Sequence, residues 1–359
     1  MKGLFIYKYL TLGGVESVLR TRLAGLPALG IEAEAWFMSG GPGASLFEAV
    51  AEQVKIGDAE DLADWIFSSP PDVACVIDTE EALGVLGGFG STLPVVVESH
   101  SPYRENRVYL YWLARANIRS FLVPSRYQAR AIERRARSIA PVMIVPNPVP
   151  ESFVAAPTRF DPTPPSPIVA WIGRLDALKD WKACIRIVGR RSAALPAPEL
   201  WIVGEPQGAE GDRRLYEYAR RQGVLRNMRW YPSFPHDRMP RLLDAVRDSG
   251  GVVLSTSREE SFGMSVAEAM ARECPVVVPS SGPFPEFVEH GVTGRLYQPG
   301  DVRQAAGEVA VFLQDTDARR SCGRRAREAI LARHAPEVAL RLLADELHKV
   351  VADSPRAMG

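Results

Sequence analysis

Short apolar runs alternate with amphipathic stretches along the whole chain, and this alternation predicts parallel sheets. In the first half, the runs that predict strands are residues 3–7, 32–37, 73–77, 95–97, 121–123 and 143–145. Helical patterns lie between these runs, for example over 15–26 and 126–136. Apolar strands that alternate with helices are typical of a parallel sheet covered by helices on both faces.

A second alternating series follows a proline-rich stretch. Five prolines fall between Ala155 and Pro167, which excludes a helix or a central strand and predicts a semi-rigid linker. After it, strands are predicted at 168–172, 200–203, 228–231, 252–255 and 276–278, with helices at about 180–195, 237–247, 264–272, 301–314 and 317–351. The chain is therefore predicted to form two doubly wound α/β domains.

The predicted domain boundaries follow from these changes in hydrophobic pattern and proline content. We expect a first Rossmann-like domain over 1–155, a linker over 156–167, a second Rossmann-like domain over 168–335, and a C-terminal helix over 336–359 that packs back on the first domain. Ligands of such sheets bind beyond the carboxyl ends of the strands. A ligand-binding cleft between the two domains is therefore expected.

Composition excludes several classes of protein. The 359 residues include 43 Lys+Arg and 43 Asp+Glu, so no overall positive field would attract nucleic acid. No apolar run approaches the ~20 residues of a membrane span. Residues 1–7 resemble a strand rather than a signal peptide, and the four cysteines show no paired spacing. These features predict a cytoplasmic protein with reduced thiols.

The stretch from Arg258 to Met270 is the most informative part of the sequence. It follows an apolar run, passes through the pair Phe262-Gly263 and enters a helix. The N-terminus of a helix after a strand offers free N–H groups and a positive dipole end to an anion. Glu260 and Glu268 stand on either side of this turn and suit hydroxyl recognition. A phosphate flanked by hydroxylated groups indicates a nucleotide sugar.

Two further loops of the second domain contain candidate ligand residues. Gly173 and Arg174 come directly after the first strand of this domain, and Lys179 follows on the same loop. The two cations could hold a pyrophosphate, or they could belong to an ordinary solvated loop. Gly204 ends the next strand, where a glycine permits close backbone approach to a ligand or simply makes a turn.

The first domain contributes a glycine pair and a histidine. Gly13-Gly14 follows the first strand and opens a helix, so this loop could approach a substrate closely, although turns use glycine widely. His100 follows the strand at 95–97 and would face the same cleft. A single histidine at a strand end fits either a structural or a catalytic role.

Taken together, these motifs resemble the retaining family-4 glycosyltransferases of the GT-B fold. The matching segments are Gly13-Gly14, Val123-Pro124-Ser125, Val145-Pro146-Asn147, Gly173-Arg174-Leu175 with Lys179, Val203-Gly204, Glu260 to Glu268, and Gly291-Val292-Thr293-Gly294 before Gly300-Asp301. The sequence departs from the family pattern at Ser261, Asp180 and Pro148, where glycine is more usual.

The resemblance implies a role for each site residue. The first domain would bind the acceptor and the second the nucleotide sugar. Arg174 and Lys179 would hold the donor pyrophosphate, and Glu268 the ribose hydroxyls. Glu260 would hold the transferred sugar, together with backbone N–H groups around the segment 261–264 (Ser261, Phe262, Gly263 and Met264). Gly14, next to Gly13, would approach the phosphate, and His100 would lie near the reacting face of the sugar. Gly173 and Gly204 would line the donor site.

The chemistry implied by the family needs no metal and no cofactor besides the nucleotide-sugar co-substrate. Negative charge develops on the leaving diphosphate, where Arg174, Lys179 and the helix N-terminus would stabilise it. The family is thought to deliver the acceptor hydroxyl to the face that the phosphate leaves. The catalytic set is therefore predicted as Glu260, His100, Arg174 and Lys179, without a nucleophile. A glycan, a glycolipid or a small natural product would suit as acceptor.

The segment Arg104–Arg137 departs from the neutral balance of the chain. It contains nine arginines against Glu105 and Glu133, with five interleaved aromatic residues: Tyr103 just before it, and Tyr109, Tyr111, Trp112 and Tyr127 within it. This pattern predicts a face that meets an anionic acceptor or an anionic membrane. The alternative is a pair of solvated helices whose arginines extend along the surface.

Two other functions fit the same motifs. A GT-B nucleotide-sugar epimerase would cleave the same bond without an acceptor, and a non-catalytic subunit would only bind the nucleotide sugar. The base, the sugar, the acceptor and the oligomeric state are not encoded in any pattern of this sequence.

Overall fold

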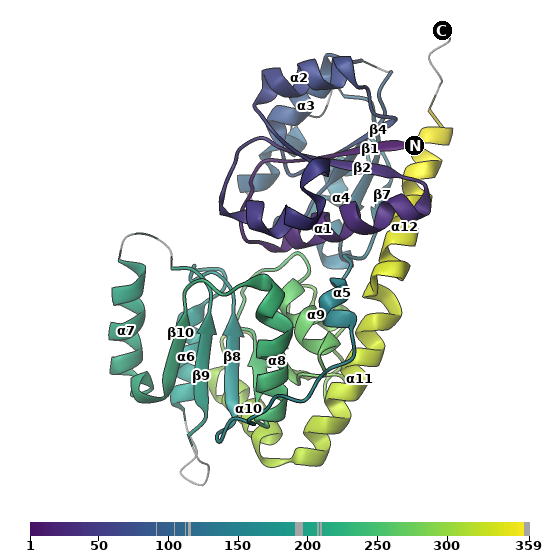
Figure 1. The fold of residues 1–359 in the computed structure, drawn as a ribbon. Coiled ribbons are helices and arrows are strands. Elements are labelled where there is room, and N and C mark those ends of the chain that lie inside the picture. Colours follow the sequence, from purple (N-terminus) through teal and green to yellow (C-terminus); the bar gives the residue numbers. More distant parts are fainter. Residues whose placement is uncertain are drawn as a thin grey trace. The chain divides into compact units, whose positions relative to one another are not determined.

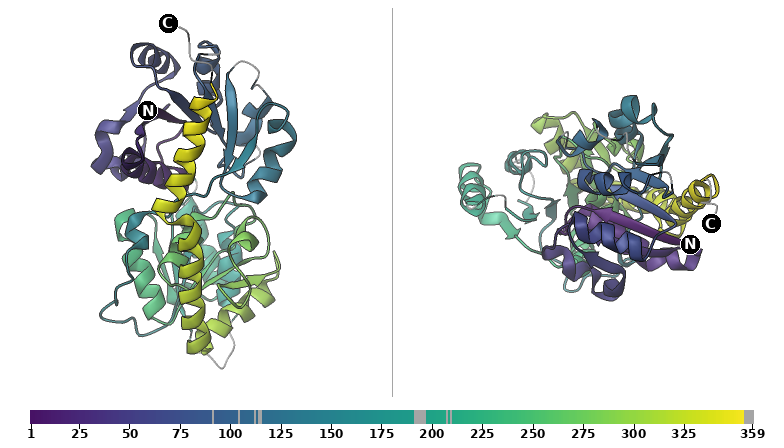
Figure 2. Two further views of the ribbon diagram at one scale, coloured as in Figure 1. Left: turned by 90° about the vertical axis from the view of Figure 1, so that its right-hand side faces the viewer. Right: turned by 90° about the horizontal axis from the view of Figure 1, so that it is seen from above.

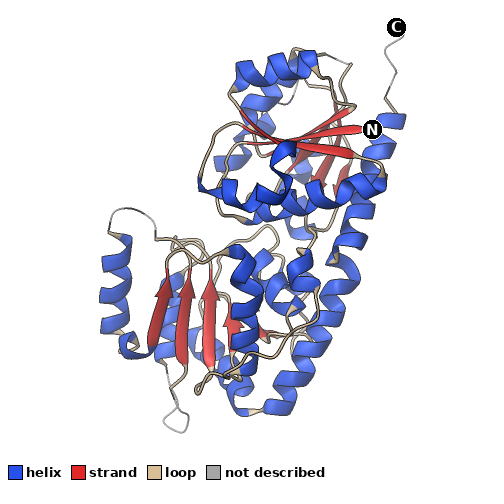
Figure 3. Cartoon of the chain, in the orientation of Figure 1, coloured by secondary structure: helices blue, strands red, loops and turns tan. Residues whose placement is uncertain are grey.

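The computed structural model describes residues 1–90, 92–103, 105–111, 113, 116–190, 197–206, 208 and 210–354. The chain divides into two compact units: unit 1 contains Met1–Pro150 and Arg333–Gly359, and unit 2 contains Glu151–Ala332. In each unit, strands are flanked by helices (Figure 3). The predicted class, two doubly wound α/β domains, is confirmed.

Unit 1 is built on a seven-stranded parallel sheet with the order β3-β2-β1-β4-β5-β6-β7. Its strands are β1 (Lys2–Tyr7), β2 (Glu32–Phe37), β3 (Val54–Ile56), β4 (Val73–Ile77), β5 (Val95–Glu98), β6 (Ile118–Val123) and β7 (Val142–Ile144). Phe5 of β1 pairs with Ala35 on one side and Cys75 on the other. All five residues of β4 are buried, as expected for a central strand covered on both faces.

Helices cover both faces of this sheet and bury one apolar cluster on each. They are α1 (Gly14–Gly25), η1 (Leu26–Leu29), η2 (Pro42–Gln53), α2 (Ala59–Ser68), α3 (Glu80–Gly87), η3 (Glu105–Tyr111), α4 (Arg126–Ala136) and α12 (Pro336–Ala352). The last of these, α12, lies along unit 1 (Figure 2). Its residues Leu340, Leu343 and Leu347 are buried in one cluster with Leu19 and Leu23 of α1. The C-terminal helix thus completes the core of unit 1.

Unit 2 has a six-stranded parallel sheet with the order β10-β9-β8-β11-β12-β13. Its strands are β8 (Ile168–Ile172), β9 (Glu199–Val203), β10 (Met228–Tyr231), β11 (Val252–Leu254), β12 (Val276–Pro279) and β13 (Arg295–Tyr297). The apolar pattern did not predict β3 or β13. Both are three-residue edge strands, and β13 begins with Arg295, so neither presents an apolar run.

The helices of unit 2 again lie on both faces of its sheet. They are α5 (Glu151–Val154), α6 (Trp181–Gly189), α7 (Gly211–Arg221), η5 (Leu225–Asn227), η6 (His236–Arg238), α8 (Met239–Asp248), α9 (Met264–Ala271), η7 (Phe284–Glu286), α10 (Val302–Gln314) and α11 (Thr316–His334). Figure 1 shows β10, β9 and β8 side by side, with α8 on one face and α6 on the other. The helical pattern predicted over 317–351 is broken before Pro336, which has no N–H and starts α12.

The proline-rich segment 156–167 belongs to unit 2, because the units divide between Pro150 and Glu151. Thr158 donates its hydroxyl to Asp244 of α8 at 3.0 Å. The backbone N–H of Phe160 donates to Asp248 at 2.7 Å. The guanidinium of Arg241 lies 4.7 Å from the centre of the Phe160 ring. The segment therefore packs along α8 as part of unit 2.

Among the described residues, no helix combines the length and the apolar character that crossing a bilayer requires.

Candidate functional site

Two loops at the carboxyl edge of the unit 2 sheet bring most of the predicted donor residues together. The β8–α6 loop spans residues 173–180, and the β11–α9 loop spans residues 255–263. Strands β8 and β11 are neighbours, and the strand order reverses between them. This reversal is the topological switch point at which doubly wound sheets bind ligands.

Backbone and side-chain hydrogen bonds join the two loops. The indole of Trp171 donates to the hydroxyl oxygen of Thr256 at 2.9 Å. That hydroxyl lies 2.9 Å from the carbonyl oxygen of Lys179 and 3.0 Å from that of Asp180. The backbone N–H of Arg258 donates to Leu178 O at 2.7 Å. The loops thus hold each other in place before any ligand arrives.

Lys179 and Glu260 form the central ion pair of this edge. The Lys179 Nζ lies 2.5 Å from Glu260 Oε1, and the Ser257 hydroxyl donates to the same oxygen at 2.9 Å. The Glu260 side chain is 10% exposed and that of Lys179 is 22% exposed. A cation and a carboxylate are thus held at one point, each still reachable by a ligand.

Arg174 is placed apart from this pair. Its Nε lies 3.4 Å from Asp176 Oδ2, and about half of its side chain is exposed. Asp176 also accepts the backbone N–H of Lys179 at 2.7 Å. The two cations predicted on this loop therefore stand in separate ion pairs.

Asp180 explains one departure from the family pattern. Its φ is +46°, in the left-handed region where glycine is common and aspartate is tolerated. Its carboxylate caps α6 by accepting the Ala183 N–H at 3.2 Å. The other carboxylate oxygen accepts from Arg258, with Nη2 at 2.8 Å. Aspartate at this position thus fixes both the helix start and the neighbouring loop.

The segment 261–264 turns into α9 through a left-handed glycine. Gly263 has φ of +99°, and a Cβ there would lie 2.7 Å from the Phe284 ring. Phe262 is buried, with its ring centre 5.1 Å from that of Phe287. Ser261 is half-buried, and Met264 is the first residue of α9. This arrangement presents the α9 N-terminus at the edge where Glu260 lies.

Glu268 lies in α9 and is buried, with 6% of its surface exposed. Its Oε1 is 3.6 Å from Nε2 of His236, a residue that the sequence did not single out. No local pattern marks His236, because it enters the site from η6, which follows β10. The tertiary structure alone joins the two side chains.

Gly204 and Gly173 meet in the backbone. Gly204 has φ of +146°, and a Cβ there would lie 1.9 Å from the carbonyl oxygen of Gly173. The Gly173 N–H donates to Val203 O at 2.9 Å. Glycine at 204 is thus required by the close approach of two neighbouring strand ends.

In unit 1, Gly13 and Gly14 begin α1, with Gly13 as its N-cap. The buried Glu16 carboxylate accepts the backbone N–H and the hydroxyl of Thr11, each at 2.6 Å. A Cβ at Gly13 would lie 2.7 Å from the other Glu16 oxygen. The glycine pair is thus part of a loop folded around a carboxylate.

His100 lies at the carboxyl end of β5 in a buried chain of charges. Its Nε2 is 2.8 Å from Glu98 Oε2, and Arg22 donates to both Glu98 oxygens at 2.7 and 2.9 Å. Burial by itself would raise the pKa of Glu98, but the charge of Arg22 and the hydrogen bond from His100 lower it to about 2. The ion pair therefore orients His100 through its Nε2.

Asp78 fixes the backbone that carries His100. One of its oxygens accepts the N–H groups of His100 and Ser101 at 2.8 and 2.6 Å, and the other accepts the Tyr109 hydroxyl at 3.0 Å. Burial raises the pKa of Asp78. No local pattern marks Arg22 or Glu98 as a site residue, although Glu98 directly ends the apolar run before His100.

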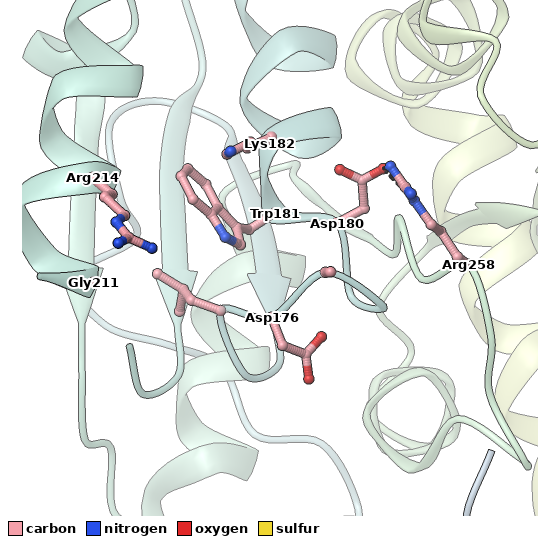
Figure 4. A pocket seen from close by; sticks show the side chains of 9 residues that line it. Asp176, Asp180, Trp181, Lys182, Gly211, Arg214 and Arg258 are labelled. Atoms are coloured by element: carbon pink, nitrogen blue, oxygen red, sulfur yellow. Dashed lines mark hydrogen bonds and ion pairs between the residues drawn. The ribbon is translucent and has the colours of Figure 1, made fainter. Parts of the chain in front are cut away.

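A hollow of about 370 Å³ lies beside the β8–α6 loop (Figure 4). It is lined by Leu175, Asp176, Ala177, Asp180, Trp181, Lys182, Gly211, Arg214 and Arg258. In Figure 4 the Asp180 carboxylate points toward Arg258, away from Trp181. Lys179, Glu260 and Glu268 lie outside this lining, so we place the candidate site at the switch point, where the predicted residues meet, and not in the hollow.

Among the described residues, no group of three or more His, Cys, Asp or Glu side chains could hold a metal ion. The predicted metal independence stays a prediction.

Comparisons with known proteins bear on the family and the fold. Residues 158–329 match the family model of glycosyl transferases group 1. A D-inositol 3-phosphate glycosyltransferase of Corynebacterium jeikeium is 30% identical over 194 residues, which cover 53% of this chain and 44% of the relative. An N-acetyl-alpha-D-glucosaminyl L-malate synthase of Bacillus anthracis is 38% identical over 79 residues, 22% of this chain and 21% of the relative. The matched regions span less than half the length of these curated relatives.

Solved structures match over nearly the whole chain. HepE of Anabaena, in complex with UDP and glucose, has a TM-score of 0.84 at 20% identity, covering 97% of this chain and all of that one. Sucrose-phosphate synthase of Thermosynechococcus elongatus has a TM-score of 0.80 at 17% identity, covering 99% and all of that chain. At such identities the likeness concerns the fold.

The two parallel sheets, with polar loops meeting at a switch point, define a protein of the GT-B class. Residues 158–329, most of unit 2, belong to the group 1 glycosyl transferases, the retaining GT-B transferases of family 4. The predicted fold and family are confirmed.

Proposed function

We propose that the protein is a retaining glycosyltransferase that moves a sugar from a nucleoside-diphosphate sugar to an acceptor hydroxyl. The observation that carries this proposal is the contact between Lys179 and Glu260, 2.5 Å apart at the switch point of unit 2. A cation and a carboxylate at one position suit a ligand in which an anionic phosphate is joined to a hydroxylated ring.

In this proposal, unit 2 holds the donor. Lys179 and Arg174 bind the pyrophosphate, and Glu268 binds the ribose hydroxyls. Glu260 binds the transferred sugar together with backbone N–H groups of the segment 261–264, where α9 begins. Lys179 then exchanges its carboxylate partner for phosphate oxygens, which releases Glu260 to accept sugar hydroxyls. The roles of Gly13, Gly14 and His100 toward the donor, and of unit 1 toward the acceptor, are predictions from the family resemblance.

The bond to the sugar breaks as negative charge grows on the diphosphate. In this proposal, two cations and a helix N-terminus stabilise this charge, and electrostatic stabilisation of this kind is the largest single contribution in many enzymes. We assign no nucleophile: the acceptor hydroxyl attacks from the face that the diphosphate leaves, and a phosphate oxygen takes its proton. The chemistry is proposed to proceed without a metal.

Uridine diphosphate sugars are the first donors to test. The Anabaena HepE structures were solved with UDP, with UDP and glucose, and with UDP-glucose. A thermal-shift screen of UDP-, GDP- and ADP-sugars identifies the donor, because a ligand that binds the folded state raises its stability by mass action.

The variant Glu260→Ala tests the assigned chemistry. We expect it to abolish most sugar transfer while nucleoside diphosphate binding stays nearly intact, because the carboxylate contacts the sugar and not the nucleotide. Equal loss of both would contradict the role of Glu260. Conversion of the donor without any acceptor would instead identify an epimerase, and binding without turnover by the purified chain would identify a non-catalytic subunit.

We also propose that unit 1 meets an anionic surface, either a membrane or an anionic acceptor, through helix α4. Arg126, Arg130 and Arg134 recur every four residues and are exposed, whereas the alternate positions Gln128 and Ile132 are buried. Exposed apolar side chains follow the helix at Ile139, Met143 and Ile144. Basic residues beside exposed apolar ones suit peripheral contact with anionic lipid.

Not every arginine of the segment Arg104–Arg137 belongs to this face. Arg119 donates to the carbonyl oxygen of Asp353 at 2.6 Å, which places a cation at the C-terminus of α12. Arg137 pairs with Glu133. Arg104, Trp112 and Arg115 lie outside the described residues. We therefore propose that the protein is cytoplasmic and contacts the membrane peripherally through α4.

A further inference from the structure

His236 lies beside the carboxylate that is proposed to bind ribose. It is the first residue of η6, in the connection that follows β10. Its Nε2 lies 3.6 Å from Glu268 Oε1, and Glu268 is almost fully buried in α9. At this separation the two atoms are beyond hydrogen-bond distance, and a small closing movement would bring them within it.

The imidazole ring is held by packing against an aromatic neighbour. Phe153 of α5 is fully buried, and its ring centre lies 5.5 Å from that of His236, with the two planes at 62°. Edge-to-face pairs of this kind favour one ring orientation. Helix α5 also packs against α9, which carries Glu268. The ring and the carboxylate are therefore positioned by the same small group of elements.

The two ring nitrogens of His236 have different surroundings. Nδ1 is buried and has no hydrogen-bond partner among the described residues, whereas Nε2 faces Glu268. A proton on Nδ1 would be a buried donor without an acceptor, whereas a proton on Nε2 faces a carboxylate. The proton of the neutral ring is therefore favoured on Nε2, where it can be donated to the carboxylate.

We propose that His236 is a positioning residue for Glu268 and through it sets the affinity for the ribose of the donor. This inference rests on the proposed function, in which Glu268 accepts the ribose hydroxyls. An ionised carboxylate has about four lone-pair sites, so Glu268 can accept from His236 and from two hydroxyls together. Once the 3.6 Å separation closes, a hydrogen bond from Nε2 fixes the rotation of the carboxylate, which then meets both hydroxyls in one orientation.

Two substitutions separate the donated hydrogen bond from the packing. His236→Phe keeps a ring against Phe153 but removes the donor, and His236→Gln keeps an N–H donor at the reach of Nε2. Isothermal titration with UDP, GDP and ADP, and with their 2′-deoxy forms, measures the dissociation constants without any acceptor. For the diphosphate that binds best, we expect His236→Phe to weaken binding roughly 10-fold, as for the loss of a hydrogen bond to a charged group.

The other readouts distinguish positioning from general damage. The dissociation constant of His236→Gln for the diphosphate should lie within about threefold of the wild-type value, because the contribution of one hydrogen bond varies by about that much. The preference for the ribose form over the 2′-deoxy form should shrink in His236→Phe. In steady-state assays the KM for the donor should rise while kcat changes little, because the contact is made equally in the ground and transition states.

The outcomes distinguish a failure of the inference on His236 from a failure of the proposed function. If the wild type binds a diphosphate and His236→Phe binds it equally well, the inference on His236 is wrong while the proposed function stands. If the wild type binds none of the three diphosphates, the proposed function fails. Should His236→Phe not fold, His236→Asn, whose amide is too short to reach Glu268, must show the same loss of ribose preference.

Discussion

The backbone of Gly204 passes so close to Gly173 that a Cβ at position 204 would lie 1.9 Å from the Gly173 carbonyl oxygen. Each glycine follows its strand, β9 or β8, and these strands are neighbours in the sheet. The loop that carries Arg174 and Lys179 starts from this contact. The position of the proposed phosphate-binding residues thus depends on Gly204, which has no side chain to contact a ligand.

Replacing Gly204 with alanine should destabilise unit 2 strongly. The new side chain would meet backbone atoms and would adopt a φ of +146°, so we expect a loss of about 3 kcal/mol or more in the free energy of unfolding. Urea denaturation, monitored by circular dichroism, measures the free energy of unfolding. The control is Gly84→Ala in α3, where a Cβ meets no atom within 4 Å. A Gly204→Ala variant as stable as the control would show that the two loops can separate freely.

Lys179 should matter far more for transfer than for stability. We expect Lys179→Ala to reduce the rate of donor-dependent transfer by about 100-fold or more, because it removes a preorganised cation from the leaving diphosphate. The rate at which nucleoside diphosphate is released measures the rate of transfer. The matched control is Lys182→Ala, a nearby lysine whose Nζ lies 5.4 Å from the centre of the Trp181 ring. Equal effects of the two variants would refute a specific role for Lys179.

The buried pair of Glu98 and Arg22 predicts a pH dependence of stability. The pKa of Glu98 is lowered from 4.5 to about 2 in the folded state. A carboxyl with a depressed pKa stabilises the fold fully above its unfolded pKa, and this contribution is lost as pH falls from about 4.5 toward 2. The shift corresponds to roughly 3 kcal/mol, at about 1.4 kcal/mol per pKa unit.

The measurement compares unfolding free energies of the wild type and Glu98→Gln between pH 7 and pH 3. Their difference should be largest at neutral pH and should shrink below pH 4.5. The control is Glu81→Gln, which breaks the exposed pair with Lys8 and should change stability by less than about 1 kcal/mol. A difference that is constant with pH would show that the charge of Glu98 contributes nothing. If Glu98→Gln does not fold, the pair replacement Arg22→Met with Glu98→Gln takes its place.

Helix α4 should bind anionic lipid in a salt-sensitive manner. We expect the wild type to float with vesicles that contain anionic phospholipid and to dissociate as salt rises, because screening weakens the attraction. Arg130→Glu with Arg134→Glu should abolish flotation. Arg220→Glu with Arg221→Glu on α7 changes the net charge equally and should not. Absence of flotation by the wild type would leave an anionic acceptor, and not a membrane, as the partner of this face.

Local sequence was enough to predict the elements whose pattern is strong. Helix α4 begins and ends at the predicted residues, because its buried positions recur every four residues. Strands β2, β4, β8 and β10 also match their predicted bounds, since apolar or aromatic residues predominate in each. The edge strands β3 and β13 were missed, because an edge strand of three residues needs only hydrogen bonds to its neighbour and no continuous apolar run.

The sequence by itself determined the α/β class, the family, and the loops that hold the candidate residues, because these depend on periodicity and on motifs within a few positions. Only the tertiary structure decided which side chains meet. Lys179 and Glu260 lie 81 positions apart, Arg22 and Glu98 lie 76 apart, and His236 reaches Glu268 from a different strand end. Lys179 meets Glu260 because a parallel sheet brings the carboxyl ends of distant strands to one edge, whereas Arg22 reaches Glu98 from the last turn of α1. No local pattern records which residues arrive together.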